Sequence, residues 1–146
     1  MKSDLETLTS KTGIISEDFN AFYLQNKDIH QEFVYQPSVS SPLPIMHYSE
    51  NMESYRGKTV RFRPLVDVVA DYQPVLYLAD DDYVDKPWVW VGNIGVDFSI
   101  YYSFEIDDPI PIFVYHSGMA GFPDSSSRVK LGESLADFKS QLMSID

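Results

Sequence analysis

The sequence predicts a single α+β domain, residues 1–146, in which two N-terminal helices and a C-terminal helix pack on an antiparallel sheet. Three observations lead to this fold class. Apolar and polar residues alternate along Phe98–Ile106, helical patterns occupy both ends of the chain, and the strand patterns lie between them. With 146 residues, of which 44% are hydrophobic, the chain is long enough to build one core.

The centre of the predicted sheet is the segment Phe98–Ile106. Its apolar residues recur at every second position, which is typical of a strand with one face in a core. They belong to the aromatic and β-branched types that suit a half-buried sheet surface. These residues are Phe98, Ile100, Tyr102, Phe104 and Ile106.

Two neighbouring strands complete a predicted meander. Residues 107–109, Asp-Asp-Pro, predict a turn, because Asp favours turns and Pro cannot donate a hydrogen bond to a neighbouring strand. Ile110–Tyr115 is then the returning strand. Trp88–Val91 precedes the central strand and is expected to be ended by Gly92 and Gly95.

Two short helices are predicted before the sheet. Ser3, with Glu6 three residues later, forms a capping-box pattern, and Gly13 suits a left-handed helix end. The second helix begins at Ser16, and acidic residues 17 and 18 favour the positive end of its dipole. Its apolar stripe consists of Phe19, Phe22 and Tyr23.

The middle of the chain holds weaker signals. Residues 33–46 carry three prolines and are predicted to form a loop or an edge strand, because Pro fixes φ and lacks a donor. Residues 48–55 indicate a brief helix, whereas residues 65–70 show no clean period.

Two more strands are predicted in the same region. Val60 and Phe62 alternate with Arg61 and Arg63, which indicates a strand with a basic outer face. The second strand is Val75–Ala79, which directly follows a proline.

The last predicted element is a C-terminal helix. A loop at residues 118–127 precedes it, and Ser134 with Asp137 resembles a capping box. The apolar residues expected on its buried face are Leu135, Phe138, Leu142 and Ile145.

The net charge of −11 is concentrated in one part of the chain. Residues 64–127 hold eleven acidic residues and one basic residue, Lys86, so this segment carries a charge of −10. Such a chain repels nucleic acid and anionic membrane, whereas a basic protein partner is attracted to it. The alternative interpretation is ordinary charge for solubility.

Four of these acids fall within six residues and are the predicted partner-binding site. Because a buried unpaired charge is very costly, we expect them to lie on an exposed loop that faces the basic partner. They are Asp80, Asp81, Asp82 and Asp85.

Composition narrows the class of protein further. The chain has no cysteine, which excludes disulfides and thiolate metal sites. Its first residues lack the apolar segment of a secretory signal, and no apolar run reaches the roughly 18 residues of a membrane span. We therefore expect a cytoplasmic protein. No feature of the sequence predicts an oligomeric state.

Patterns typical of enzymes are missing from the sequence. A calcium loop counted from Asp80 would place Asp85 and Val91 where an EF-hand needs Gly and Glu. The nucleophile motif G-x-S-x-G and a phosphate-binding glycine loop are also absent. We predict a protein without catalysis, metal or cofactor, with an enzyme that uses Asp/Glu pairs as the weaker alternative. Three histidines lie far apart in the chain and not at metal-ligand spacing: His30, His47 and His116.

Trp88 and Trp90 share one face of a predicted strand. Core packing is the ordinary use of such residues, and a platform for a ligand is the alternative.

Three stretches of the chain resemble the SUKH superfamily, a group of bacterial immunity proteins related to a yeast cell-wall assembly regulator. SEDFNAFY is similar to the family's second helix, and VGNIGVDFSIYYSF is similar to its central Gly-rich turn and strand, with Asp97 at the family's Asp position. PIPIFVYHSG and GESLADFKSQL resemble its Pro-led strand and its terminal helix. Ser16 stands where the family usually has Pro, and residues 25–27 replace its Asn-Gly.

This resemblance implies a binding protein without catalytic residues that neutralises a toxin by occlusion. Toxins countered by the family are often nucleases, whose substrate grooves must be basic, so an acidic surface suits their blockade. The alternative is a regulatory or scaffold domain of the same fold without a toxin partner. A toxin gene directly upstream would favour the first interpretation.

Overall fold

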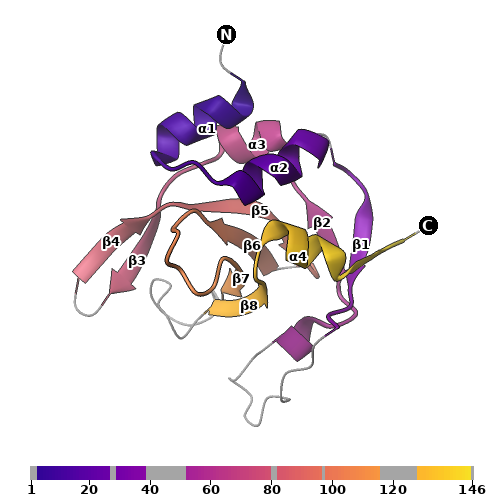
Figure 1. Cartoon of the computed structure of the whole chain (residues 1–146). Helices are drawn as coiled ribbons and strands as arrows, with labels where there is room; N and C mark the ends of the chain where they lie inside the picture. The colour runs from indigo at the N-terminus through magenta and orange to yellow at the C-terminus, as the bar shows by residue number, and fades with distance from the viewer. Residues whose placement is uncertain are drawn as a thin grey trace.

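The structure is a computed structural model of the chain, and it describes residues 3–26, 29–38, 52–79, 82–96, 98–115 and 128–145. Within these residues, helices accompany a seven-stranded sheet and a separate two-stranded sheet (Figure 1). Every described strand pair is antiparallel. The predicted α+β class with an antiparallel sheet is therefore confirmed.

The two predicted N-terminal helices are α1, Asp4–Thr12, and α2, Glu17–Asn26. Ser3 caps α1, because its side-chain oxygen accepts a hydrogen bond from the backbone N–H of Glu6 at 3.2 Å. Gly13 ends α1 at a φ of 75°, a left-handed conformation that glycine adopts without strain. Both predicted boundaries of this helix are confirmed.

Asp18 connects α2 to the last helix, α4 (Leu135–Ser140). Its carboxylate accepts hydrogen bonds from the backbone N–H groups of Leu135, at 2.7 Å, and Ala136, at 3.3 Å. These donors have no partner inside their own helix, and the helix dipole favours a negative charge beside them. Asp18 therefore caps a helix more than a hundred residues away in the chain.

The seven-stranded sheet has the strand order β8-β7-β6-β5-β2-β1-β9. Strands β5 to β8 form a meander, which confirms and extends the predicted centre of the fold, and β2 joins β5 from an earlier part of the chain. The strands are β1 (Glu32–Tyr35), β2 (Thr59–Phe62), β5 (Trp88–Ile94), β6 (Phe98–Ser103), β7 (Ile112–Tyr115), β8 (Arg128–Gly132) and β9 (Leu142–Ser144).

The central strands differ from the prediction at their ends. β6 stops at Ser103, whose hydroxyl accepts a hydrogen bond from the backbone N–H of Glu105 at 3.2 Å and so begins a turn. Ile106, which was expected on the buried face, is 90% exposed. β5 continues through Gly92 instead of ending there, with a bulge between Trp90 and Gly92.

The C-terminal helix is shorter than predicted. Ser134 caps α4, since its hydroxyl accepts a hydrogen bond from the backbone N–H of Asp137 at 2.9 Å. The helix ends at Ser140, and the chain then pairs with β1 as strand β9. Leu142 still packs on the core, but Ile145 is exposed. A local helical pattern cannot show this long-range pairing.

Three segments in the middle of the chain also depart from the prediction. Of the loop or edge strand expected at residues 33–46, residues 33–35 belong to β1, which lies inside the sheet between β2 and β9, so the prediction is wrong there. Residues 36–38 form neither helix nor strand, and residues 39–46 lie outside the described residues. The segment without a clean period is the short helix α3, Leu65–Ala70. Of the helix expected at residues 48–55, the described part is the 3-10 helix η1, Met52–Tyr55. The predicted loop at residues 118–127 lies outside the described residues.

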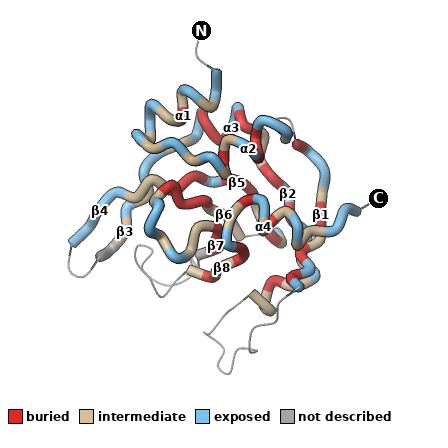
Figure 2. The backbone as a smooth tube through the Cα atoms, in the orientation of Figure 1, coloured by how far each residue is buried: buried red, intermediate tan, exposed pale blue. Residues whose placement is uncertain are grey.

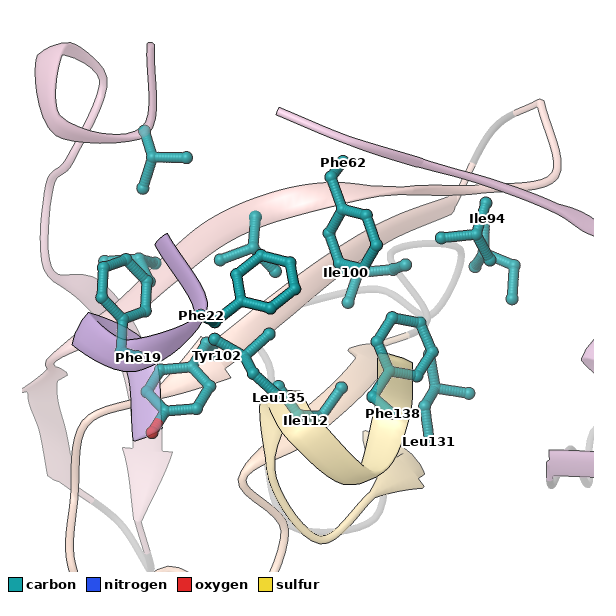
Figure 3. Packing of buried hydrophobic residues seen from close by; sticks show 14 of the residues in the cluster. Phe19, Phe22, Phe62, Ile94, Ile100, Tyr102, Ile112, Leu131, Leu135 and Phe138 are labelled. Atoms are coloured by element: carbon teal, nitrogen blue, oxygen red, sulfur yellow. The ribbon is translucent and has the colours of Figure 1, made fainter. Parts of the chain in front are cut away.

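One large core joins the helices to one face of the sheet (Figures 2 and 3). Phe138 of α4 packs against Phe62 of β2 and Tyr35 of β1, with ring centroids 5.8 Å apart in each pair. Phe19 of α2 packs against Tyr102 of β6 at 5.4 Å. The predicted packing of Leu135 and Phe138 on this sheet is confirmed, whereas Leu142 belongs to the sheet itself as the first residue of β9 and contacts the core from there.

Gly92 lets β2 and β5 approach closely. A Cβ atom at this position would lie 2.5 Å from the carbonyl oxygen of Arg61, a backbone atom that cannot rotate away. We expect Gly92→Ala to lower the free energy of unfolding by about 1–3 kcal/mol, because the two strands must separate. Urea unfolding measures this loss. Val96→Ala, at a nearby exposed turn position, should change stability by less than about 0.5 kcal/mol.

Candidate functional site

The two-stranded sheet is a hairpin that projects from the body of the protein (Figure 1). It consists of β3, Val75–Ala79, and β4, Asp82–Lys86, which pair with each other and not with the larger sheet. The predicted strand at Val75–Ala79 is confirmed, and so is Thr59–Phe62 as the strand with arginines on its outer face. We call residues 75–86 the projecting hairpin.

The base of the projecting hairpin is fixed to the larger sheet. The ring of Tyr77 meets Trp88 edge to face at a centroid distance of 5.3 Å. Lys86 forms an ion pair with Glu105 at 3.1 Å and lies over the Tyr77 ring at 5.1 Å. The one basic residue of the acidic segment is therefore engaged at the base of the hairpin.

Two of the four predicted site residues are described. Asp82 and Asp85 are exposed, but they belong to strand β4, so the expected loop is wrong for this segment. Tyr83 and Val84 lie between them and favour a strand, which pairs with β3 from Val75 to Ala79. Because successive side chains alternate, Asp82 and Asp85 point to opposite faces of the hairpin. Asp80 and Asp81 lie outside the described residues.

Much of the projecting hairpin is exposed (Figure 2), and apolar residues are among the exposed ones. Tyr83 is 56% exposed, and Leu76 and Val84 are exposed by more than a third. Exposed apolar residues that lie next to charged residues on a projecting element are typical of a surface that contacts another protein.

The sheet face opposite the main core carries a second cluster, which sequence patterns did not predict. We call this side the outer face. Trp88 and Phe113 are buried there at a centroid distance of 4.8 Å, and the guanidinium of Arg128 lies 4.5 Å and 3.9 Å from their rings. Arg128 also forms a two-bond ion pair with Asp108, at 2.8 and 3.0 Å.

The Arg128–Asp108 pair is shielded from solvent, with side-chain exposures of 7% and 5%. Burial raises the pKa of the Asp108 carboxyl, but hydrogen bonds from Arg128, the Ile110 backbone N–H and Ser103 outweigh this effect. The net result is a pKa below the ordinary value. The pair holds the turn after β6 against β8.

A groove crosses the outer face beside this cluster. It has two adjoining parts, of about 650 and 240 Å³, and both are lined by Arg63 and Trp90. The larger part reaches Arg61 and Asn93, and the smaller part reaches Val75 at the base of the projecting hairpin. We call these two depressions the outer-face groove.

The two tryptophans therefore differ in their surroundings. Trp88 packs in the buried cluster as expected, whereas Trp90 is 37% exposed in the groove wall. The sequence contained both the basic face of residues 60–63 and the tryptophan pair. The sequence did not show that β2 lies next to β5. This pairing places Arg63 over the ring of Trp90.

Among the described residues, no group of three or more His, Cys, Asp or Glu side chains is arranged to hold a metal ion. His30 is exposed, and His47, His116 and Asp97 lie outside the described residues. In the same described part of the chain, no helix combines the length and the apolar character needed to cross a membrane.

Comparison with known proteins gives no match to a family model, to a curated protein or to a solved structure. The resemblance to the SUKH superfamily therefore stays a prediction.

Proposed function

We propose that this chain is a non-catalytic immunity protein that neutralises a basic toxin by occlusion, with the projecting hairpin as its docking element. The observation that carries this proposal is the exposure of Asp82, Tyr83 and Asp85 on a strand that stands clear of the main sheet. The resemblance to the SUKH superfamily supports a toxin as the partner.

The charge around the hairpin favours a basic partner. Lys86, the only basic residue in the segment from residue 64 to residue 127, is paired with Glu105 and does not offset the acids further along the hairpin. Exposed acids attract a basic surface over several ångströms and accelerate association, and the effect falls as salt screens it. The apolar side chains then supply contact area at short range.

Removing the hairpin charges is expected to slow binding and leave the fold intact. A fourfold variant should associate with its partner about tenfold more slowly than the wild type at low salt, because electrostatic steering is lost. Its substitutions are Asp80→Asn, Asp81→Asn, Asp82→Asn and Asp85→Asn. Its rate should also depend less on salt. The measurement is the association rate at several salt concentrations, with the purified product of the gene directly upstream as the partner.

A matched variant distinguishes the effect of the hairpin acids on the association rate from the effect of the protein's total net charge. It also loses four exposed acids, but from other parts of the surface, and should keep most of the wild-type rate. Equal rates for the wild type and the hairpin variant at low salt would contradict the docking role of the hairpin. The matched substitutions are Asp4→Asn, Glu6→Gln, Glu17→Gln and Asp107→Asn.

A further inference from the structure

The outer-face groove contains an aromatic side chain that is fixed and still accessible. The indole N–H of Trp90 donates hydrogen bonds to the carbonyl oxygen of Gly92 and to Oδ1 of Asn93, both at 2.9 Å. The guanidinium of Arg63 lies 3.9 Å from the ring centroid and covers one side of it. A ring held in this way loses little conformational freedom when a ligand packs on its exposed surface.

Arg63 is itself held in position. Its guanidinium pairs with Asp71 and donates a hydrogen bond to the carbonyl oxygen of Trp90 at 3.3 Å. Only 16% of its side chain is exposed. Arg63 therefore serves as a wall of the groove and not as a freely available cation.

Arg61 is differently placed. It lines the larger part of the groove and pairs with Glu32, and the two side chains are 66% and 40% exposed. An ion pair with this much exposure contributes little to stability, so a carboxylate from outside can replace Glu32 at small cost. An arginine can then bind that carboxylate through two parallel hydrogen bonds.

Basic residues lie close together beside the groove, although two of them are paired, Arg61 with Glu32 and Arg63 with Asp71. Lys58, Arg61 and Arg63 are three of the eleven basic residues and lie within six positions. The side chain of Lys58 approaches Gly95, which lines the groove. Pro64 and Val96 add apolar surface beside Trp90. The site therefore offers a cation next to an apolar anchor.

We infer that the outer-face groove binds an acidic, extended segment of a partner protein. One carboxylate of that segment takes the place of Glu32 on Arg61, and a neighbouring apolar side chain packs on Trp90. The larger part of the groove, about 650 Å³, is within the size range of ligand-binding clefts. This binding does not depend on the projecting hairpin, which prefers the opposite charge.

Intrinsic fluorescence provides the assay, because Trp90 is partly exposed and Trp88, the other tryptophan, is buried. The probe is an acetylated, amidated pentapeptide that alternates glutamate with leucine. The control peptide has lysine in place of glutamate. We expect a saturable change in tryptophan emission with the glutamate peptide, and none with the lysine peptide. The variant Trp90→Phe should show no such change in emission and should bind the glutamate peptide more weakly by calorimetry, because the phenyl ring lacks the N–H that fixes the indole.

Two single substitutions are expected to move the affinity in opposite directions. Arg61→Gln should weaken binding of the glutamate peptide by about tenfold, because a charged hydrogen-bonding partner is lost. Glu32→Gln should tighten binding severalfold, because the internal competitor for Arg61 is removed. If the Arg61–Glu32 pair had only a structural role, the two substitutions would not change the affinity for the peptide in opposite directions. Both side chains are exposed, so neither variant should unfold the protein.

Several results would overturn the inference. The first is equal affinity of the fourfold hairpin variant for the two peptides, measured in that variant because the lysine peptide could bind the acids of the wild-type hairpin. The second is unchanged binding by the Arg61→Gln variant. The third is inorganic phosphate that binds as tightly as the glutamate peptide, which would define a general anion site. The fourfold hairpin variant should bind the glutamate peptide at least as well as the wild type. Loss of peptide binding in that variant would place the site on the hairpin instead.

Discussion

Replacing Arg128 by methionine is expected to lower the free energy of unfolding by about 3–5 kcal/mol, because it leaves the buried Asp108 carboxylate without its cation. Methionine keeps much of the apolar contact with Trp88 and Phe113, so most of the loss should come from the uncompensated charge. Urea unfolding at neutral pH measures it.

The double variant Arg128→Met, Asp108→Asn shows how much of this loss comes from the uncompensated charge of Asp108. The amide is neutral, and its oxygen can still accept the hydrogen bond that Asp108 receives from the backbone N–H of Ile110 at 2.9 Å. We therefore expect the double variant to be more stable than Arg128→Met alone. Equal stability of the double and the single variant would show that the lost contact of Arg128 with the aromatic rings, and not the uncompensated charge of Asp108, dominates at this site.

The same pair predicts a loss of stability in acid. Asp108 has a lower pKa in the folded protein than in the unfolded chain, where an aspartate titrates near about 3.9. The stability that the ionised Asp108 carboxylate contributes is therefore fully present above about pH 3.9 and is lost as the pH falls through the lowered pKa of the folded protein. In the double variant this part of the acid dependence should be absent.

Phe138→Ala is the second substitution with a large expected effect, about 3–5 kcal/mol of lost stability. Phe138 is fully buried between α4 and the sheet, where it contacts Phe62 (Figure 3). It also contacts Tyr35. Next to it, Gly132 of β8 lies so close to the α4 backbone that the helix has little room to move inward and fill a cavity. The free energy of unfolding in urea measures the loss.

An exposed helical position serves as the control for this core substitution. Leu24 on α2 is 72% exposed, so Leu24→Ala should change stability by less than about 0.5 kcal/mol. Similar losses for Phe138→Ala and Leu24→Ala would contradict the placement of α4 on the main core.

Local signals predicted the elements whose residues carry their own pattern. The cap at Ser3, the left-handed Gly13 and the alternation along β6 depend on neighbours in sequence and were read correctly. α3 was missed because its six residues are almost all apolar and give no helical period. The apolar pattern up to Ile145 predicts helix where β9 lies, because the pairing of β9 with β1 depends on residues far away in the chain.

The same distinction applies to the candidate sites. The acids of the projecting hairpin are visible as a cluster in the sequence, but the position of Asp82 and Asp85 on a strand follows from the pairing of β4 with β3. The outer-face groove was not visible, because it exists only where β2 lies beside β5 and brings Arg63 to Trp90. Asp108 and Arg128 are likewise joined across twenty residues, and only the fold brings them together.

The docking role of the projecting hairpin is tested most directly by amide hydrogen exchange, with and without the purified product of the gene directly upstream. An immunity protein that docks through this hairpin should show slower exchange at residues 75–86 in the complex, while helices α1 and α2 exchange as before. Absence of a complex, or slower exchange confined to other parts of the chain, would contradict the proposal.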